Sequence, residues 1–266
     1  MKKLIVLALV ALGASQGMRA QSDVEFGYFD HMSIGASVGT DGIGFDVAFP
    51  IKDVAAMRAG ISFVPTVKVD EKIHATNNKN SSVCDDIDIQ GKSNIFDGKF
   101  LLDYYPFRRS SFHLTAGAFF GNSEIATVIN TSSILKDPAD YGTAGLILGS
   151  GDKEYQLTTD MDGNAKIKVK ANSFKPYVGL GFGRAVMKNH RFGVSFDMGV
   201  KFWGTPGVYA DAKKNDAFSK KETDHHFKYE DLAEDDDEDL RDAIKIIEKI
   251  KVYPVLNLRL TYRIFK

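Results

Sequence analysis

Large apolar residues alternate with small or polar residues along most of this chain, and this two-residue period constrains the fold more than any other feature. Between residues 191 and 203, every second residue is apolar, and the residues between them are Gly, Ser, Asp or Lys. Successive side chains of a β-strand point to opposite faces, so the pattern predicts a strand with one apolar face. Seven further segments repeat it, at 32–38, 43–49, 55–63, 96–104, 112–120, 178–182 and 255–264.

The face opposite the apolar rows is unusual for a soluble protein. It carries mostly Gly, Ser and Thr, with a few charges of both signs. A membrane barrel turns its large apolar residues toward lipid and its polar residues toward the lumen. We therefore predict an all-β fold, an antiparallel up-and-down transmembrane barrel of eight strands. The alternative is a secreted β-sandwich or lipocalin-like barrel.

The lengths of the connections favour the membrane barrel. The three long connections are 64–94, 121–173 and 204–253, and the short ones are 40–42, 50–53, 106–110 and 187–190. With eight strands and a periplasmic N-terminus, all three long connections face outward. Outer-membrane barrels have short periplasmic turns and long external loops, whereas a sandwich gives no reason for this asymmetry.

The first 20 residues have the features of a secretory signal peptide. Lys2 and Lys3 precede an apolar stretch, Leu4 to Ala14, that is too short to span a bilayer. Small residues follow, and cleavage is expected after Ala20 or, alternatively, after Gly17. An uncleaved anchor is the other interpretation. Residues 21–266 are then one barrel domain.

Composition excludes several other classes of protein. Lys plus Arg (34) and Asp plus Glu (35) nearly balance, which argues against a nucleic-acid binder. A single Cys excludes a disulfide framework and a cysteine-based zinc site. No run beyond the N-terminus reaches the roughly 18 apolar residues of a membrane helix.

Aromatic and glycine residues recur in five segments of the chain. These are LLDYYPF at 101–107, FHLTAGAFFGN at 112–122, FKPYVGLGFG at 174–183, FGVSFDMGVKFWGTP at 192–206 and YPVLNLRLTYRIF at 253–265. They resemble strands of small bacterial outer-membrane β-barrel proteins of the OmpA, OmpX and OmpW type. The resemblance implies a Gram-negative outer membrane, with the lipid bilayer and the assembly machinery as partners and no cofactor. Such barrels often end in an aromatic residue, whereas here Lys266 follows Phe265.

Charged residues at inward positions predict a plugged lumen. Eight strands enclose a space that side chains can fill, and unpaired charges buried there would be costly. Four acids and five bases can nearly neutralise one another, so a salt-bridged plug is favoured over a gated pore. Within this network we expect Asp46 to pair with Arg58 and Asp197 with Arg259. The network comprises Asp46, Arg58, Asp97, Lys99, Asp103, Asp197, Lys201, Arg259 and Arg263.

Two of the long connections carry further signals. The alternating runs 155–159 and 166–171 flank Asp162-Gly163, which predicts a hairpin above the membrane. The alternative is two additional membrane strands, giving ten.

Helical spacing predicts a short amphipathic helix over 230–251 with an acidic first half. A cation or partner site is one interpretation of these acids, and a solvated face is the favoured one.

Histidines give no recognisable catalytic constellation. The candidates His31, His113, His225 and His226 form no Ser-His-acid arrangement in the sequence pattern, so we predict no enzyme and no catalytic, cofactor or metal site.

The favoured function is a structural or surface-interaction barrel whose loops meet an extracellular ligand or protein. The alternatives are a passive porin-like conduit for small or hydrophobic molecules, and a lipid-modifying enzyme.

Overall fold

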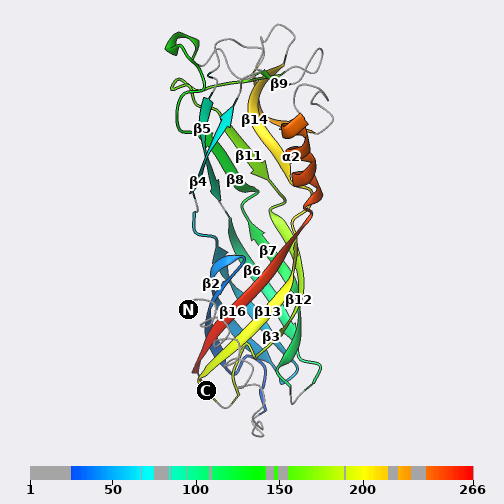
Figure 1. The fold of residues 1–266 in the computed structure, drawn as a ribbon. Coiled ribbons are helices and arrows are strands. Elements are labelled where there is room, and N and C mark those ends of the chain that lie inside the picture. Colours follow the sequence, from blue (N-terminus) through cyan, green and yellow to red (C-terminus); the bar gives the residue numbers. More distant parts are fainter. Residues whose placement is uncertain are drawn as a thin grey trace, which may run out of the picture.

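Eight strands close into an antiparallel barrel in the computed structural model of this chain (Figure 1). The structure describes residues 25–66, 68–74, 84, 86–93, 95–107, 110–141, 147–148, 155–188, 190–214, 221–228 and 238–265, so the expected signal peptide lies outside it. In barrel order the strands are β1 (Met32–Gly39), β16 (Val252–Phe265), β13 (Phe192–Phe202), β12 (Phe174–Phe182), β7 (Phe112–Gly121), β6 (Phe96–Tyr104), β3 (Ala55–Phe63) and β2 (Gly42–Ile51). This confirms the eight-strand prediction.

The two faces of the barrel wall are inverted relative to those of a soluble protein. Large apolar side chains such as Phe45, Phe100 and Leu260 stand on the outside and are about half exposed. Charged side chains such as Asp97 and Arg259 point inward and are buried. The two-residue alternation of each strand produces this arrangement, because it sends every second side chain into the lumen.

A second sheet continues from one end of the barrel (Figure 1), and the sequence analysis did not anticipate it. The three long connections all contribute to this sheet, which places them at the same end of the molecule. Its strands are β4 (Lys68–His74), β5 (Asp86–Ser93), β8 (Glu124–Asn130), β11 (Lys166–Lys170), β14 (Gly207–Lys214), β10 (Tyr155–Leu157), β9 (Ile147–Leu148) and β15 (Lys221–Phe227), which pairs with β14. A short 3₁₀ helix (Pro138–Asp140) lies between β8 and β9.

The predicted hairpin around Asp162-Gly163 is wrong. A tight turn does form, with Gly163 at φ +75° and the Asp160 carboxylate accepting from the backbone N–H groups of Asp162 and Asn164. However, β10 and β11 both pair with β14 and not with each other. The third long connection supplies β14, and this long-range pairing replaces the local one. Both strands lie outside the barrel, which excludes the ten-strand alternative.

Helix α2 (Glu238–Lys249) covers one face of the second sheet and lies within the predicted helical segment; residues 230–237 are outside the described part. Ile244 on α2 is 1% exposed, because its side chain packs into the apolar core of the sheet. Among the described residues, no helix is long and apolar enough to cross a membrane. The core residues of this sheet are Tyr155, Leu157, Val208, Ala210, Ala212, Phe227 and Ile244, with Ile167 and Ile247 packed against them.

Shortening the buried side chain of α2 should loosen the second sheet and leave the barrel intact. Truncation of a buried Ile typically costs about 2–5 kcal/mol, so Ile244→Ala should speed limited proteolysis and amide exchange in α2. Ile246→Ala, on the exposed face of the same helix, is the matched control and should behave like the wild type. Equal behaviour of the two variants would contradict the packing described here.

Candidate functional site

The barrel lumen gathers buried charges from seven of the eight barrel strands and is the candidate functional site. Eight of the nine network residues proposed from the sequence are buried there, and the ninth, Arg263, is half-buried. Lys175 and His113 join them. The buried set is Asp46, Arg58, Asp97, Lys99, Asp103, His113, Lys175, Asp197, Lys201 and Arg259.

Arg259 and Asp46 form the most extensive ion pair of the lumen. The Nε of Arg259 donates to both carboxylate oxygens of Asp46, at 3.0 and 2.9 Å, and its Nη2 donates to Oδ1 at 2.6 Å. The two residues lie on β16 and β2, which are separated by β1. Gly35 of β1 leaves the path open, because a Cβ atom there would lie 2.4 Å from the Nε of Arg259.

Arg58 occupies the centre of a second group. Its guanidinium contacts Asp103 at 2.7 Å and Asp197 at 3.0 Å. Because β3 and β13 stand opposite each other in the ring, the contact between Arg58 and Asp197 spans the lumen. His113 reaches the same Asp197 at 2.8 Å, passing over Gly181 on the strand between them.

Asp97 forms the third group, near the end of the barrel that carries the second sheet. It accepts from Lys175 at 2.6 Å and from Lys201 at 2.8 Å. Lys201 also lies 4.1 Å from the centre of the Phe119 ring, a cation–π contact. Lys175 was not predicted, because the apolar alternation of this strand was traced only over 178–182, although Lys175 continues the inward alternation of Tyr177 and Gly179.

The predicted pairs Asp46–Arg58 and Asp197–Arg259 are wrong. Each prediction joined residues on hydrogen-bonded neighbours, but the observed register places them diagonally, with Arg58 opposite Ala48 and Arg259 opposite Ser195. The side chains instead reach across the lumen or over an inward glycine to a strand farther round the ring. Long Arg side chains favour these distant partners when the intervening residue has no Cβ.

The short-turn end of the lumen is closed by the connection between β12 and β13. Its Ala185 carbonyl accepts from Ser33 Oγ at 2.6 Å and from Thr261 Oγ1 at 3.1 Å. The Ala185 N–H donates to the Tyr105 hydroxyl at 2.9 Å. Arg263 donates to the carbonyls of Met187 and Lys188 in the same turn. This turn therefore folds into the barrel and fills its end.

Apolar side chains close the opposite end. Phe119 and Tyr177 pack edge to face inside the lumen, with ring centres 5.5 Å apart, together with Leu101 and Val255. Beyond them, the Trp203 indole donates to the carbonyl of Ile250, just after α2, at 2.7 Å. The helix is thereby attached to the mouth of the barrel.

The space left between the charged groups is small. A cavity of about 10 Å³, lined by side chains that include Ser37, Lys99 and Asn257, lies inside the lumen. A volume of this size holds about one water molecule. The contacts of Lys99, 3.5 Å to Ser37 Oγ and 3.9 Å to Asp46, are longer than those of the other two lumen lysines, Lys175 and Lys201.

The candidate histidines lie in three separate places. His31 contacts Asp30 at 3.0 Å and packs against Phe26, and His113 is bound by Asp197 and the carbonyl of Ser111. His225 and His226 lie on β15, where His226 stacks on Tyr209 with ring centres 4.6 Å apart. In the part of the chain that the structure describes, no three His, Cys, Asp or Glu side chains gather as a metal site.

Comparison with known proteins finds similarity only among solved structures. No family model matches the sequence, and no curated protein matches it. The crystal structure of Acinetobacter baumannii CarO is 15% identical, with a TM-score of 0.44, over 89% of this chain and 97% of that chain. Acinetobacter baumannii CarO2 is 14% identical, with a TM-score of 0.46, over 90% of this chain and all of that chain. The roles of the residues above are therefore inferred from their own geometry.

Arg259 and Asp46 should be strongly coupled in stability. Removing one partner leaves an unpaired buried charge and typically costs about 3–5 kcal/mol. Arg259→Met should therefore lower the unfolding midpoint in urea more than Arg259→Met combined with Asp46→Leu does.

The combination of Arg259→Met with Asp197→Ala is the matched control. These two residues belong to separate ion-pair groups, so their effects should add and this double variant should be less stable than either single one. Coupling of Arg259 to Asp197 instead of Asp46 would show that the lumen register is different.

Proposed function

We propose that this protein is a bacterial outer-membrane barrel with a closed, salt-bridged lumen, and that its second sheet forms a surface-exposed interaction domain. One observation carries the proposal, the combination of an apolar outer wall with a buried, charged lumen in a closed barrel. In water the outer wall would expose a continuous apolar band, whereas in a bilayer the same band faces hydrocarbon.

Exposed aromatic side chains mark both edges of this band. Phe96, Phe120, Phe174 and Phe202 stand at the end nearest the second sheet. Tyr104, Phe107, Phe182 and Phe192 stand at the short-turn end. Two such girdles at the interfaces are typical of outer-membrane barrels, and they support a bilayer-spanning role.

The difference between the two ends supports the orientation. The short turns after β2, β6 and β12 lie at one end, and the second sheet and the short β1–β2 turn lie at the other (Figure 1). With the short turns in the periplasm, the second sheet projects from the cell and is available to an extracellular ligand or protein. Export through a cleaved signal peptide and insertion by the assembly machinery belong to the same proposal.

The closed lumen favours a structural or interaction role over transport. Residues 183–188 fill one end, and the Phe119–Tyr177 cluster fills the other. A passive conduit is the second candidate, and the excess of buried bases favours it. Five of the buried lumen side chains are Lys or Arg and four are Asp, so a lumen that opened would attract anions. A lipid-modifying activity would need a nucleophile beside a base, and His113 faces a carboxylate and a carbonyl instead.

Planar-bilayer recordings should separate the closed barrel from the conduit. We expect no conductance steps from the wild type, because its lumen is filled. Phe119→Ala with Tyr177→Ala should produce steps only when Arg58→Ala and a Gly-Ser replacement of residues 184–188 are added, because the turn and the Arg58 ion pairs fill the rest of the lumen. Phe120→Ala with Phe174→Ala, two outward rings of the same strands, is the control and should stay silent. Sustained steps from the wild type would favour the conduit.

Cysteine labelling in intact cells should establish the orientation. In a Cys84→Ser background, Met161→Cys, in the turn between β10 and β11, should react with a membrane-impermeant maleimide, since Met161 is 81% exposed. Lys52→Cys, at a short turn, should react only after the outer membrane is permeabilised. The opposite pattern would place the second sheet in the periplasm.

A further inference from the structure

A row of polar residues crosses the second sheet on the face opposite α2. The strand register aligns one residue from each of six neighbouring strands. In order these residues are Lys68, Lys92, Thr127, Lys168, Tyr209 and His226. Their sequence neighbours Ile167, Val208 and Phe227 face the core beneath α2, so the row faces away from that core. We call it the lysine row.

Lys68 and Lys92 stand directly opposite each other on β4 and β5. Like charges in directly opposite positions destabilise a sheet unless something neutralises them. Neither lysine has an ion pair with an acid among the described residues. Of the acids on this face, Asp70 keeps its charge but accepts from the Gln90 amide at 2.8 Å, and Asp88 lies 3.6 Å from Lys72. Two opposed, unpaired cations are a place where an anion would be stabilised.

The other half of the row is held in position by its own contacts. Asp224 accepts from Lys168 at 2.7 Å and from Lys170 at 2.9 Å. These hydrogen bonds lower the pKa of Asp224, so the carboxylate stays ionised and fixes both lysines. Lys170 also lies 4.8 Å from the centre of the Tyr209 ring, which stacks on His226. Lys166, on the same face, lies 3.6 Å from Glu124, and this acid offsets its charge.

The lysine row and the adjacent Lys170 lie close to the edge of the apolar band. Lys92 is four residues from Phe96, and Lys170 is four residues from Phe174. Both Phe residues belong to the aromatic girdle at this end of the barrel. Four residues of extended chain span at most about 14 Å. In a bilayer these lysines would therefore lie at or just above the level of the lipid headgroups.

We propose that the lysine row binds the phosphate groups of the phosphorylated glycolipid in the outer leaflet of the outer membrane. Lys68 and Lys92 supply the uncompensated positive charge, and Lys168 and Lys170 extend it along the sheet. The inference rests on the proposed outer-membrane location and orientation. It assigns the second sheet a lipid ligand beside the barrel, in addition to any extracellular partner.

Binding of lipid A to the refolded, full-length protein in non-ionic detergent tests this inference. Bisphosphorylated lipid A is the probe, and titration calorimetry is the measurement. A basic side chain near an anionic lipid surface contributes to the binding free energy, and the loss of two lysines should raise the dissociation constant roughly thirtyfold. We expect this loss for Lys68→Gln with Lys92→Gln, and we expect wild-type binding to weaken as salt is raised.

Two controls make the result specific. Lys249→Gln with Lys251→Gln removes the same charge from exposed positions at the end of α2, on the other side of the sheet, and should bind like the wild type. Dephosphorylated lipid A should bind far more weakly, and inorganic pyrophosphate should compete only weakly. Equal binding by the two double variants would overturn the inference, as would equal binding of the dephosphorylated lipid. Competition by pyrophosphate at the concentration of lipid A would indicate a site for free phosphate and would also overturn it.

The readouts separate this inference from the proposed function. Conductance reports only on the lumen, and cysteine labelling reports only on orientation. If labelling places the second sheet outside and the lysine variants still bind lipid A normally, the inference fails and the proposed function stands. If labelling places the sheet in the periplasm, the proposed function fails. The outer-leaflet glycolipid is then also excluded as the ligand of the lysine row.

Discussion

Charges inside the barrel can be neutralised only by one another, and the rest of the structure depends on how they meet. A buried ion without a partner costs several kcal/mol, and the lumen contains ten buried charged or titratable side chains in the described part of the chain. Their contacts join strands that are not neighbours in the ring, as in Arg259 to Asp46 and Arg58 to Asp197. These contacts tie the wall together across its interior as well as along its hydrogen bonds.

Inward glycines make this arrangement possible. A glycine on the strand between two partners leaves room for an Arg or His side chain to pass, as Gly35 and Gly181 do. The same glycines, taken from the sequence alone, could equally have indicated room for water or a narrow path. In the folded barrel that room is occupied by side chains, which is why the cavity among them holds about one water molecule.

The barrel could be predicted from the sequence because its signal is local. Alternation in segments such as 191–203 decides which side chains face outward, and all eight strands follow from it. The pairings in the lumen could not be predicted, since they depend on register and on side-chain reach across the ring. The second sheet was missed for a related reason. Strands such as β10 and β11 are short and find their partner in β14, about 40 to 60 residues away in the sequence. Lys175 could have been found by extending the alternation of its strand toward residue 174.

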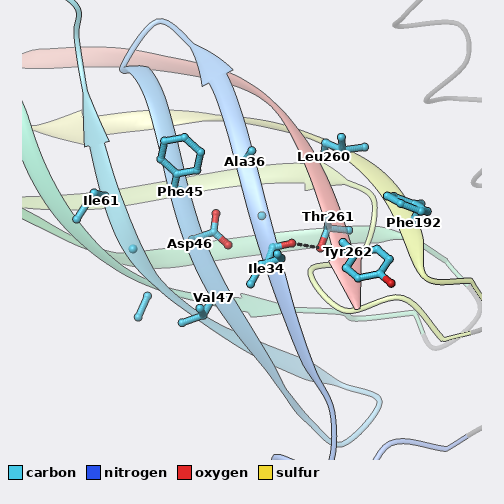
Figure 2. Close-up of a pocket in the computed structure, with 13 residues that line it drawn as sticks. Ile34, Ala36, Phe45, Asp46, Val47, Ile61, Phe192, Leu260, Thr261 and Tyr262 are labelled. Carbon is cyan, nitrogen blue, oxygen red and sulfur yellow. Dashed lines mark hydrogen bonds between the residues drawn. The ribbon is translucent and has the colours of Figure 1, made fainter. Parts of the chain in front are cut away.

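The outer wall of the barrel is apolar even where the same strand carries an inward charge. Figure 2 shows apolar side chains from β1, β2, β3, β13 and β16 around a shallow groove, where Ala36 is small and Phe45, Phe192 and Tyr262 are large. Asp46 lies in the same stretch of wall, and its carboxylate is buried against Arg259. Outward apolar residues and inward polar residues thus alternate along a single strand, and the wall separates a charged interior from an apolar exterior.

Reactivity of a cysteine inside the lumen tests the closed barrel most directly. Ser37 lines the cavity and is 7% exposed, so Ser37→Cys in a Cys84→Ser background reports on access to the interior. With the folded protein in liposomes, a small methanethiosulfonate reagent should leave Ser37→Cys unmodified while it modifies Met161→Cys rapidly. Modification of both cysteines at comparable rates would contradict the account, because it would mean that the lumen is open to solutes.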